Sequence, residues 1–244
     1  MQLHLHIQLN EPITLPVNYN HILQGVIYNA VFADYPNYAD ALHDGGNQFE
    51  ERTYKAFTFG PLLGRYRIEN KQIIFLEDIT WEIRSSDAML ITILRLYFES
   101  HGMLLSTHRI RNVETAVTNF VVNDSKVKIK CISPVIAYST IEGNSYTYYY
   151  TPEEYGFYEL TKQNALRRYA AIKSETAGEL EFRPVSVRRS DKVVTRYHGI
   201  IMSGWKGKYE LEGDPELLDF LYQTGLGSKN AQGFGMFDIL KPFD

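Results

Sequence analysis

The sequence contains a single cysteine, Cys131, among its 244 residues. One cysteine excludes a disulfide within the chain and fits a reducing compartment, so we expect a cytoplasmic protein. The surrounding residues, 127–136, have the composition of a strand, which favours a buried structural thiol over a nucleophile. No apolar run reaches the roughly 20 residues that a membrane span requires. The first residues also lack a secretory signal pattern, so we expect no membrane partner.

Metal-binding and nucleotide-binding patterns are also missing. The sequence has no His, Cys and Asp cluster with zinc spacing and no carboxylate pair typical of a two-metal site. We therefore expect no metal and no cofactor. The glycine-rich run near the end of the chain lacks the Walker spacing, and it follows a predicted helix and precedes a predicted strand. Nucleotide-binding loops have the reverse order, so a phosphate bound here is expected to belong to a polymer.

The charge of the chain is unevenly distributed. The formal net charge is −4, which by itself does not indicate a nucleic-acid partner. Within residues 183–208, however, seven basic residues stand against Asp191 alone. A local basic stripe on a nearly neutral protein is typical of a polyanion site, and a solvated hairpin face is the alternative. The stripe contains Arg183, Arg188, Arg189, Lys192, Arg196, Lys206 and Lys208.

Glycine is concentrated near the end of the chain. Gly225, Gly227, Gly233 and Gly235 fall within eleven residues and bracket Lys229. Glycine permits positive φ and lets backbone N–H groups approach a ligand, so this run predicts an anion cradle with a lysine at its rim. A tight connection between a helix and a strand is the alternative.

Apolar periodicity predicts an α+β fold in two similar halves. Each half shows the order β-α-β-β-α-β, which predicts two tandem ferredoxin-like domains. The polar residues 123–125 place the boundary, giving domains 1–123 and 124–244. The predicted strands cover 2–9, 54–59, 65–68, 72–76, 80–84, 108–122, 126–138, 180–189, 193–205 and 236–240. The predicted helices cover 20–32, 35–42, 86–98, 152–172 and 214–224, the last with Asp214 as N-cap and Gly225 at its end.

Four side chains of the first half are candidates for chemistry. Tyr28 and His21 lie opposite the apolar stripe of helix 20–32, which places them near each other and away from the core. His43 stands at a glycine turn, where an imidazole titrates near neutral pH, and Lys55 lies on the predicted strand. A surface role without chemistry is the alternative. The other histidines and both tryptophans are expected to be structural: His4, His6, His101, His108, His198, Trp81 and Trp205.

With these residues assembled, the chain resembles the CRISPR-associated repeat-processing endoribonucleases, the "Cas six" family of the repeat-associated RNA-binding superfamily. The most specific match is the spacing of the four glycines, which is similar to the family motif GhGxxxxxGhG. Residues 15–20, 23–28, 42–43, 54–60 and 132–135 resemble the family as well, in the expected order. Gly60 departs from the family, which often has serine there, and this affects only local packing.

The resemblance implies an enzyme that binds CRISPR repeat RNA and cleaves precursor CRISPR RNA once per repeat without a metal. It implies His43 as general acid or base, Tyr28 as its partner and Lys55 as the cation, with His21 as the second candidate histidine. Cleavage by the 2′-OH leaves a 2′,3′-cyclic phosphate and a 5′-OH, and needs a proton acceptor, a proton donor and positive charge. The basic stripe and the glycine loop would bind RNA.

Two other functions stay open at this point. One is a non-catalytic repeat-RNA-binding subunit of a CRISPR complex, which would share the fold. The other, weaker, is a small-molecule nucleotide enzyme that uses the glycine loop. We expect repeat RNA as the partner, with other CRISPR effector subunits as further partners, and a monomer or homodimer.

Overall fold

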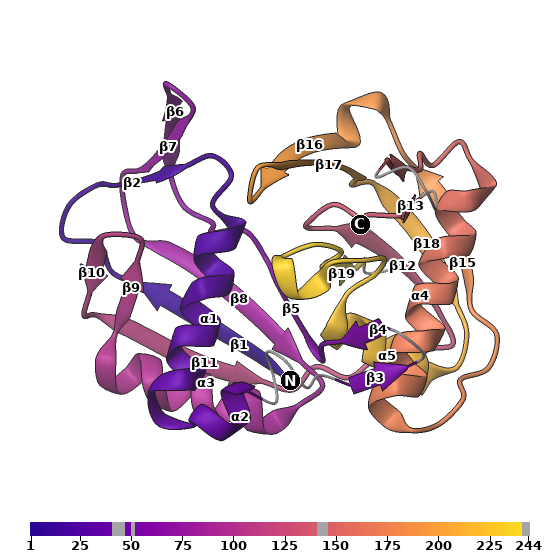
Figure 1. Cartoon of the computed structure of the whole chain (residues 1–244), viewed down its shortest axis with the longest axis horizontal. Coiled ribbons are helices and arrows are strands. Elements are labelled where there is room, and N and C mark those ends of the chain that lie inside the picture. Colours follow the sequence, from indigo (N-terminus) through magenta and orange to yellow (C-terminus); the bar gives the residue numbers. More distant parts are fainter. Residues whose placement is uncertain (41–46, 50–51, 141–145, 241–244) are drawn as a thin grey trace.

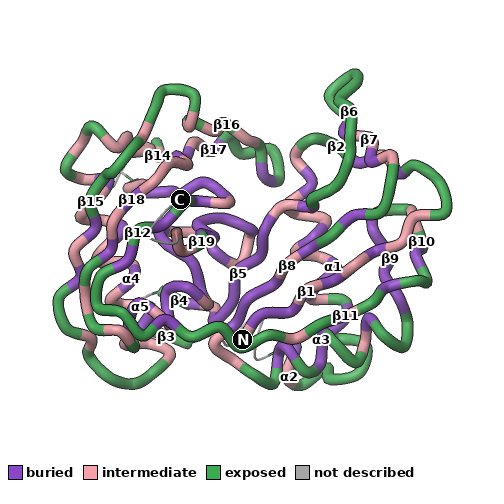
Figure 2. Tube along the Cα trace, turned by 180° about the vertical axis from the view of Figure 1, so that it is seen from behind, coloured by how far each residue is buried: buried purple, intermediate pink, exposed green. Residues whose placement is uncertain are grey.

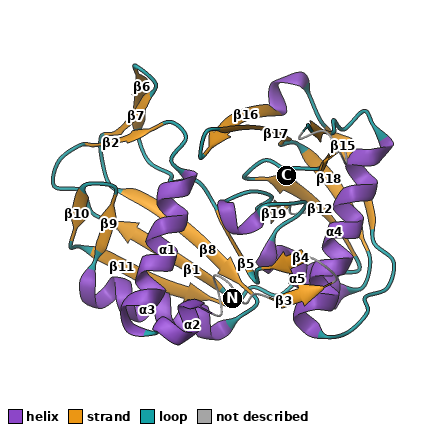
Figure 3. Ribbon diagram, viewed as in Figure 1, coloured by secondary structure: helices purple, strands orange, loops and turns teal. Residues whose placement is uncertain are grey.

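The computed structural model describes residues 1–40, 47–49, 52–140 and 146–240, and it has an α+β fold (Figure 3). The helices are α1 Asn20–Asp34, α2 Pro36–Asp40, α3 Ala88–His101, α4 Tyr155–Lys173 and α5 Pro215–Thr224, with short 3-10 helices η2 Arg189–Asp191 and η3 Asn230–Gln232. The strands of the first half are β1 Gln2–Ile7, β2 Ile13–Pro16, β3 Asn47–Phe49, β4 Arg52–Tyr54, β5 Phe57–Phe59, β6 Tyr66–Glu69, β7 Gln72–Phe75, β8 Ile79–Ser85, β9 Met103–Leu105, β10 His108–Ile110 and β11 Val113–Thr118. Those of the second half are β12 Lys126–Cys131, β13 Tyr138–Thr140, β14 Thr147–Tyr149, β15 Glu181–Ser186, β16 Lys192–Tyr197, β17 Ile200–Trp205, β18 Lys208–Glu212 and β19 Phe237–Ile239.

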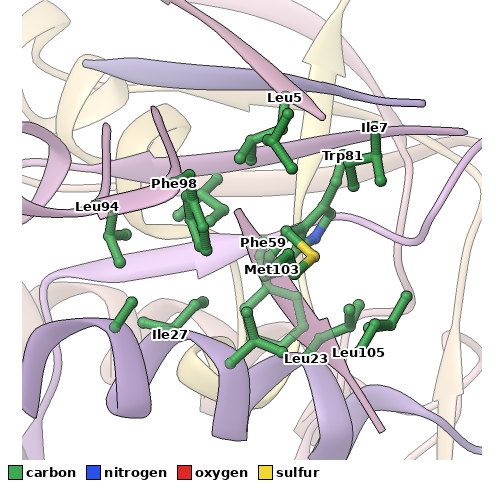
Figure 4. Close-up of a cluster of buried hydrophobic side chains, with 14 of the residues drawn as sticks. Leu5, Ile7, Leu23, Ile27, Phe59, Trp81, Leu94, Phe98, Met103 and Leu105 are labelled. Atoms are coloured by element: carbon green, nitrogen blue, oxygen red, sulfur yellow. The ribbon is translucent and has the colours of Figure 1, made fainter. Parts of the chain in front are cut away.

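The first half is built on a four-stranded antiparallel sheet in the order β11-β1-β8-β5. Helices α1 and α3 cover one face of this sheet (Figure 1). Helix α1 buries Leu23, Val26, Ile27 and Ala30, whose spacing of three and four residues gives one apolar stripe. Figure 4 shows Leu23 and Ile27 of α1 in one core with Leu94 and Phe98 of α3 and side chains of the sheet.

The second half has its own four-stranded antiparallel sheet in the order β15-β18-β12-β19. Helices α4 and α5 pack with it around a separate cluster of buried side chains. Asp214 caps α5 by accepting a hydrogen bond from Glu216 N at 2.9 Å, and Gly225 ends the helix with φ +86°. The prediction for this helix is confirmed.

The two halves are joined by buried polar contacts at the centre of the molecule, where the tube in Figure 2 is mostly buried. Arg84 on β8 is enclosed and donates to Phe237 O at 2.6 Å and to Asp238 Oδ1 at 2.7 Å. Its Nε donates to Glu82 at 2.6 Å. Thr58 on β5 donates to Phe234 O at 3.3 Å, so the end of the glycine loop is attached to the first sheet.

Several predicted elements are confirmed. Cys131 is buried, helix α3 is capped by Asp87, and the hairpin over 65–76 is formed by β6 and β7. Asp87 accepts a hydrogen bond from Met89 N at 2.9 Å, which satisfies one of the free N–H groups of the first helical turn. The described helices contain none that is long and apolar enough to cross a membrane.

Other strand predictions are wrong. Residues 54–59 do not form one strand, because β4 ends at Tyr54 and β5 begins at Phe57, which leaves Lys55 between them. Residues 193–205 form a hairpin of β16 and β17, since His198 and Gly199 take φ values of +45° and +85° in a turn. Strand β18 was not predicted, and the strand from Lys126 ends at Cys131 instead of reaching Tyr138. The residues predicted as one strand over 108–122 are two, β10 and β11.

Candidate active site

A polar cleft of about 520 Å³ lies where the two halves meet. Five separate segments line it: helix α1, the end of β4, strand β13, helix α4 and the glycine loop, which we define as residues 225–235. The lining residues are Gln24, Tyr28, Arg52, Thr53, Tyr54, Lys55, Tyr138, Ser139, Thr140, Asn164, Arg168, Ser228, Lys229, Asn230, Ala231 and Gln232. The cleft therefore requires both halves to be in place.

The charge of the cleft has one sign. Arg52, Lys55, Arg168 and Lys229 line it, and no Asp or Glu belongs to its described lining. Four cations without a carboxylate produce a strong positive potential in a partly enclosed space. Such a lining fits a polyanion such as a phosphodiester chain.

Tyr28 reaches this cleft from helix α1, as predicted for the face opposite the apolar stripe. It is half-buried, however, and its ring packs edge-on against Phe57 with centroids 6.3 Å apart. The expectation of a tyrosine away from the core is therefore only partly right. Burial, with Tyr197 as a smaller cause, raises the pKa of Tyr28 to about 12. Its hydroxyl is protonated at neutral pH and can donate a hydrogen bond.

The four glycines of the loop are buried, and the backbone N–H groups of three of them donate to carbonyl oxygens of the protein. Gly225 N donates to Leu221 O at 2.7 Å, Gly233 N to Asn230 O at 2.9 Å, and Gly235 N to Pro134 O at 2.9 Å. These three N–H groups therefore do not contribute to the anion cradle that the glycine run predicts. The half-buried rim of the loop lies between the glycines, at residues 228, 229, 231 and 232.

The glycines are needed for the shape of the loop. Gly235 has φ +74°, and a Cβ added there would lie 1.8 Å from Leu226 O. A Cβ added at Gly227, which has φ +66°, would likewise lie 2.7 Å from Ile136 O. A residue with a side chain fits neither the backbone angle nor the space. The loop is thus a packed connection, which is the alternative that the sequence left open, and it holds Lys229 at the cleft.

Lys229 itself takes a left-handed backbone conformation, with φ +64°. Its ammonium group lies 5.1 Å from the ring centroid of Tyr138. A cation over an aromatic face is attracted by the ring, which fixes the lysine at the rim while leaving it partly exposed. Lys229 and Tyr138 therefore form one wall of the cleft.

Helix α1 is clamped to the glycine loop by two amide side chains. Asn20 Nδ2 donates to Gln232 O at 2.9 Å, and Gln24 Nε2 donates to Ala231 O at 2.8 Å. The Oε1 atom of Gln24 in turn accepts a hydrogen bond from the Tyr197 hydroxyl on β16. These bonds fix the distance between the helix that carries Tyr28 and the loop that carries Lys229.

Buried polar atoms without a hydrogen-bond partner are concentrated at the cleft. Among the described residues, four buried side-chain atoms lack a partner: Tyr54 Oη, Ser86 Oγ, Arg168 Nε and Gln232 Oε1. Three of the four belong to cleft-lining residues. Native proteins satisfy nearly all buried polar groups, so this concentration indicates a site prepared for a polar ligand.

The predicted catalytic residues have different positions. Tyr28 and Lys55 both line the cleft, while His43 lies outside the described residues. His21 does not belong to the cleft lining, because it lies seven positions before Tyr28, a separation of about two helical turns. Its ring instead lies 5.4 Å from that of His198 on the β16–β17 turn, and its Nδ1 is 3.0 Å from Asn18 O.

The predicted basic stripe lies away from the cleft, and five of its seven members are exposed. Its members Arg183, Arg188, Arg189, Lys192 and Arg196 are all exposed, and none belongs to the cleft lining. Arg183 faces Glu181 at 3.6 Å, and Lys192 lies 5.9 Å from the ring centroid of Trp205. Arg188 lines a second, smaller pocket of about 300 Å³ with Lys130, Lys206 and Lys208, and Asp191 also belongs to its lining.

Of the cleft lining, sequence reasoning proposed only Tyr28, Lys55 and Lys229 as site residues, and it missed charged, aromatic and amide side chains such as Arg52, Tyr54, Tyr138, Asn164 and Arg168. Arg168 is 1% exposed, and no periodic signal marks an arginine that is to be buried. The concentration of aromatic residues around Tyr138 and the pair Arg167-Arg168 was the only available sign. The described residues contain no group of three or more His, Cys, Asp or Glu side chains placed to hold a metal ion.

Solved structures share this fold over the whole chain. A CRISPR associated protein Cas6 superposes with a TM-score of 0.76 at 25% identity, covering 99% of both chains. A RAMP protein binding different RNA substrates superposes with a TM-score of 0.80 at 20% identity, covering 99% of this chain and 100% of that one. The fold is therefore that of CRISPR-associated proteins.

Sequence comparison identifies the family within the CRISPR-associated proteins. The model of the CRISPR associated protein Cas6, C-terminal, matches residues 117–239. The CRISPR-associated endoribonuclease Cas6 1 of Methanocaldococcus jannaschii is 29% identical, over 97% of this chain and 91% of that protein. The Cas6 endoribonuclease of Pyrococcus furiosus is 25% identical, over 92% of this chain and 83% of that protein. The chain belongs to the Cas6 family of CRISPR-associated endoribonucleases.

Proposed function

We propose that this protein binds CRISPR repeat RNA and cleaves precursor CRISPR RNA within each repeat without a metal, leaving a 2′,3′-cyclic phosphate and a 5′-OH. The observation that carries the proposal is the cleft with four cations and no described carboxylate, lined by Tyr28 and Lys55 from one half and Lys229 from the other. Two relatives are named endoribonucleases, which supports RNA cleavage. Each half, 1–123 and 124–244, is proposed to be a ferredoxin-like unit, in keeping with the sheet orders.

In the proposed reaction the 2′-OH attacks the adjacent phosphorus and the 5′-oxygen leaves. His43 serves in the proton transfers. Tyr28, whose raised pKa keeps its hydroxyl protonated, donates a hydrogen bond to the phosphate or to the leaving oxygen. Lys55 and Lys229 stabilise the negative charge that develops on the phosphorane oxygens. With the roles assigned in this way, His43 is the only one of these groups that has to change its protonation state near neutral pH.

RNA contacts outside the cleft are proposed to follow the exposed basic residues. Arg188, with its neighbours in the second pocket, would bind backbone phosphates, and Arg183, Arg189, Lys192 and Arg196 would extend this path. Within the glycine loop, the rim residue Lys229 would contact the RNA, while Gly225, Gly227, Gly233 and Gly235 act by shaping the loop.

The test is incubation of the purified protein with the host's repeat RNA in excess EDTA, with analysis of the fragment ends. We expect one cut per repeat, a cyclic phosphate on the upstream fragment and a 5′-OH on the downstream fragment. His43→Ala should abolish cleavage and leave RNA binding intact. Tight repeat binding without product at any magnesium or manganese concentration would instead support a non-catalytic RNA-binding subunit.

A further inference from the structure

The structure contains two fully buried arginines in very different surroundings. Arg84 and Arg168 are each 1% exposed. Arg84 pairs with two carboxylates, Glu82 at 2.6 Å and Asp238 at 2.7 Å. Burial opposes the charge of Arg84, but these bonds outweigh burial and raise its pKa. Arg84 is thus a neutralised buried cation of the usual kind.

Arg168 has no carboxylate partner among the described residues. Its guanidinium donates only to neutral oxygens: the carbonyls of Gly225 and Gly227, the latter at 3.2 Å, and the side chains of Asn230 and Asn164, the latter at 3.2 Å. Its Nε has no partner. Burial lowers the pKa of Arg168 to about 10, and nearby Tyr54 offsets this in part. The group is therefore charged at neutral pH, and the described residues give it no counter-ion.

A buried charge without a counter-ion is costly, so its place in the molecule is informative. Arg168 lines the cleft together with Lys55 and Lys229, and its bonds hold the loop segment that presents Lys229. A charge in a low-dielectric wall acts more strongly on a ligand than an exposed one does. An anionic ligand bound in the cleft can therefore supply the negative charge that the surroundings of Arg168 lack.

We infer that Arg168 is a positioning residue whose uncompensated charge is neutralised by a phosphate of the bound RNA. This inference rests on the proposed function for the identity of the ligand. Arg168 acts through the loop and through its field, without touching the substrate. In the free protein the charge of Arg168 keeps the cleft ready for an anion, and in the complex the nearby phosphate supplies compensating negative charge, as Glu82 and Asp238 do for Arg84.

Asn164→Asp provides a direct test, because it places a carboxylate where Asn164 Oδ1 now accepts from Arg168 at 3.2 Å. The variant is nearly isosteric and keeps the acceptor. Melting curves are measured on the full chain with and without inorganic phosphate at matched ionic strength. The control is Thr140→Asp, which adds a carboxylate to the same cleft lining from strand β13.

We expect N164D to melt about 2 °C or more above the wild type without phosphate, because it completes the ion pair. Its phosphate dissociation constant should increase about tenfold or more, equivalent to about 1.4 kcal/mol. T140D should weaken phosphate binding without the gain in melting temperature. If N164D melts below the wild type, or binds phosphate as tightly, the inference is wrong.

Arg168→Lys separates the charge from the hydrogen bonds. A lysine keeps the charge but cannot make the forked contacts to the loop, so we expect a lower melting temperature with phosphate binding largely retained. Loss of phosphate binding in R168K would overturn the inference. These measurements need no RNA, so they judge Arg168 even if the protein proves not to cleave. Conversely, a wild type that cleaves repeat RNA while N164D fails the test would refute the role of Arg168 alone.

Discussion

Gly233→Ala should separate the glycine loop from the first half of the molecule. Gly233 has φ +85°, and an added Cβ would lie 2.5 Å from Cε2 of Phe59 and 2.8 Å from Nδ2 of Asn20. Phe59 is completely buried in the first core, so it has no room to move away. The alanine must either push the loop outward or strain the backbone.

Two terms determine the size of the effect. The left-handed conformation costs alanine about 1–2 kcal/mol relative to glycine. Overpacking against a buried ring costs a further 1–3 kcal/mol, approximately. The sum of about 2–5 kcal/mol should lower the melting temperature of a chain of this size by about 5–15 °C. Since Asn20 also donates to Gln232 O, the clamp between α1 and the loop is disturbed as well.

Gly25→Ala is the matched control on the neighbouring helix. A Cβ added at Gly25 meets nothing within 4 Å, and the residue lies inside α1. The same substitution there should stabilise the protein by about 0.5–1 kcal/mol, because alanine loses less conformational freedom in a helix. Differential scanning calorimetry of both variants checks the opposite signs.

The rate of RNA cleavage is the second measurement that distinguishes G233A from G25A. A shift of about 1 Å between Lys229 and Tyr28 can reduce a rate a hundredfold. We therefore expect G233A, assayed in single turnover well below its melting temperature, to cleave repeat RNA far more slowly than G25A. Equal melting temperatures and equal rates for the two variants would refute the packing argument and the clamp together.

Three further predictions concern the cleft and tyrosines that are buried or half-buried. Tyr28→Phe should reduce single-turnover cleavage by about 10²–10⁴ with RNA affinity unchanged, and a rate equal to the wild type would remove Tyr28 from the chemistry. Lys229→Ala should weaken RNA binding in filter-binding assays and reduce the slope of log K against log salt by about 0.7, whereas an unchanged slope would show that it contacts no phosphate. Burial raises the pKa of Tyr19, Tyr28 and Tyr197 to about 12 each, above the usual value of about 10. The protonated forms favour folding, so the melting temperature should hold below about pH 10 and fall as the pH rises towards 12, and a flat curve through that window would contradict their burial.

The fold was predictable where local signals are strong. The apolar stripe of α1 and the caps of α3 and α5 appear directly in the sequence, since each depends on residues within one or two turns. Strand β18 was missed because it follows β17 after only two residues, 206 and 207. The turn between β16 and β17 depends on positive φ at His198 and Gly199, and Gly199 was the sign of it in the sequence.

The cleft was predictable only in part. Helical periodicity singled out Tyr28, the glycine run singled out Lys229, and the family resemblance gave a role to Lys55. The structure brings all three to one cleft. Arg168 and Asn164 could not be found in this way, because their partners in the loop are 57 to 64 residues away in the chain. Contacts at that separation are set by the packing of α4 against the loop and have no local pattern.

The glycine motif shows how a sequence signal can indicate the right place for a different physical reason. Its spacing suggested backbone N–H groups that bind an anion, yet those of Gly225, Gly233 and Gly235 donate to carbonyls of the protein. The loop is instead organised around the buried side chain of Asn230. That side chain accepts from Arg168 and donates to Leu226 O at 2.9 Å and to Phe234 O at 3.1 Å. The glycines are required because a backbone wound this tightly around one amide leaves no room for Cβ atoms, and the positive charge of the site comes from side chains that the loop brings together.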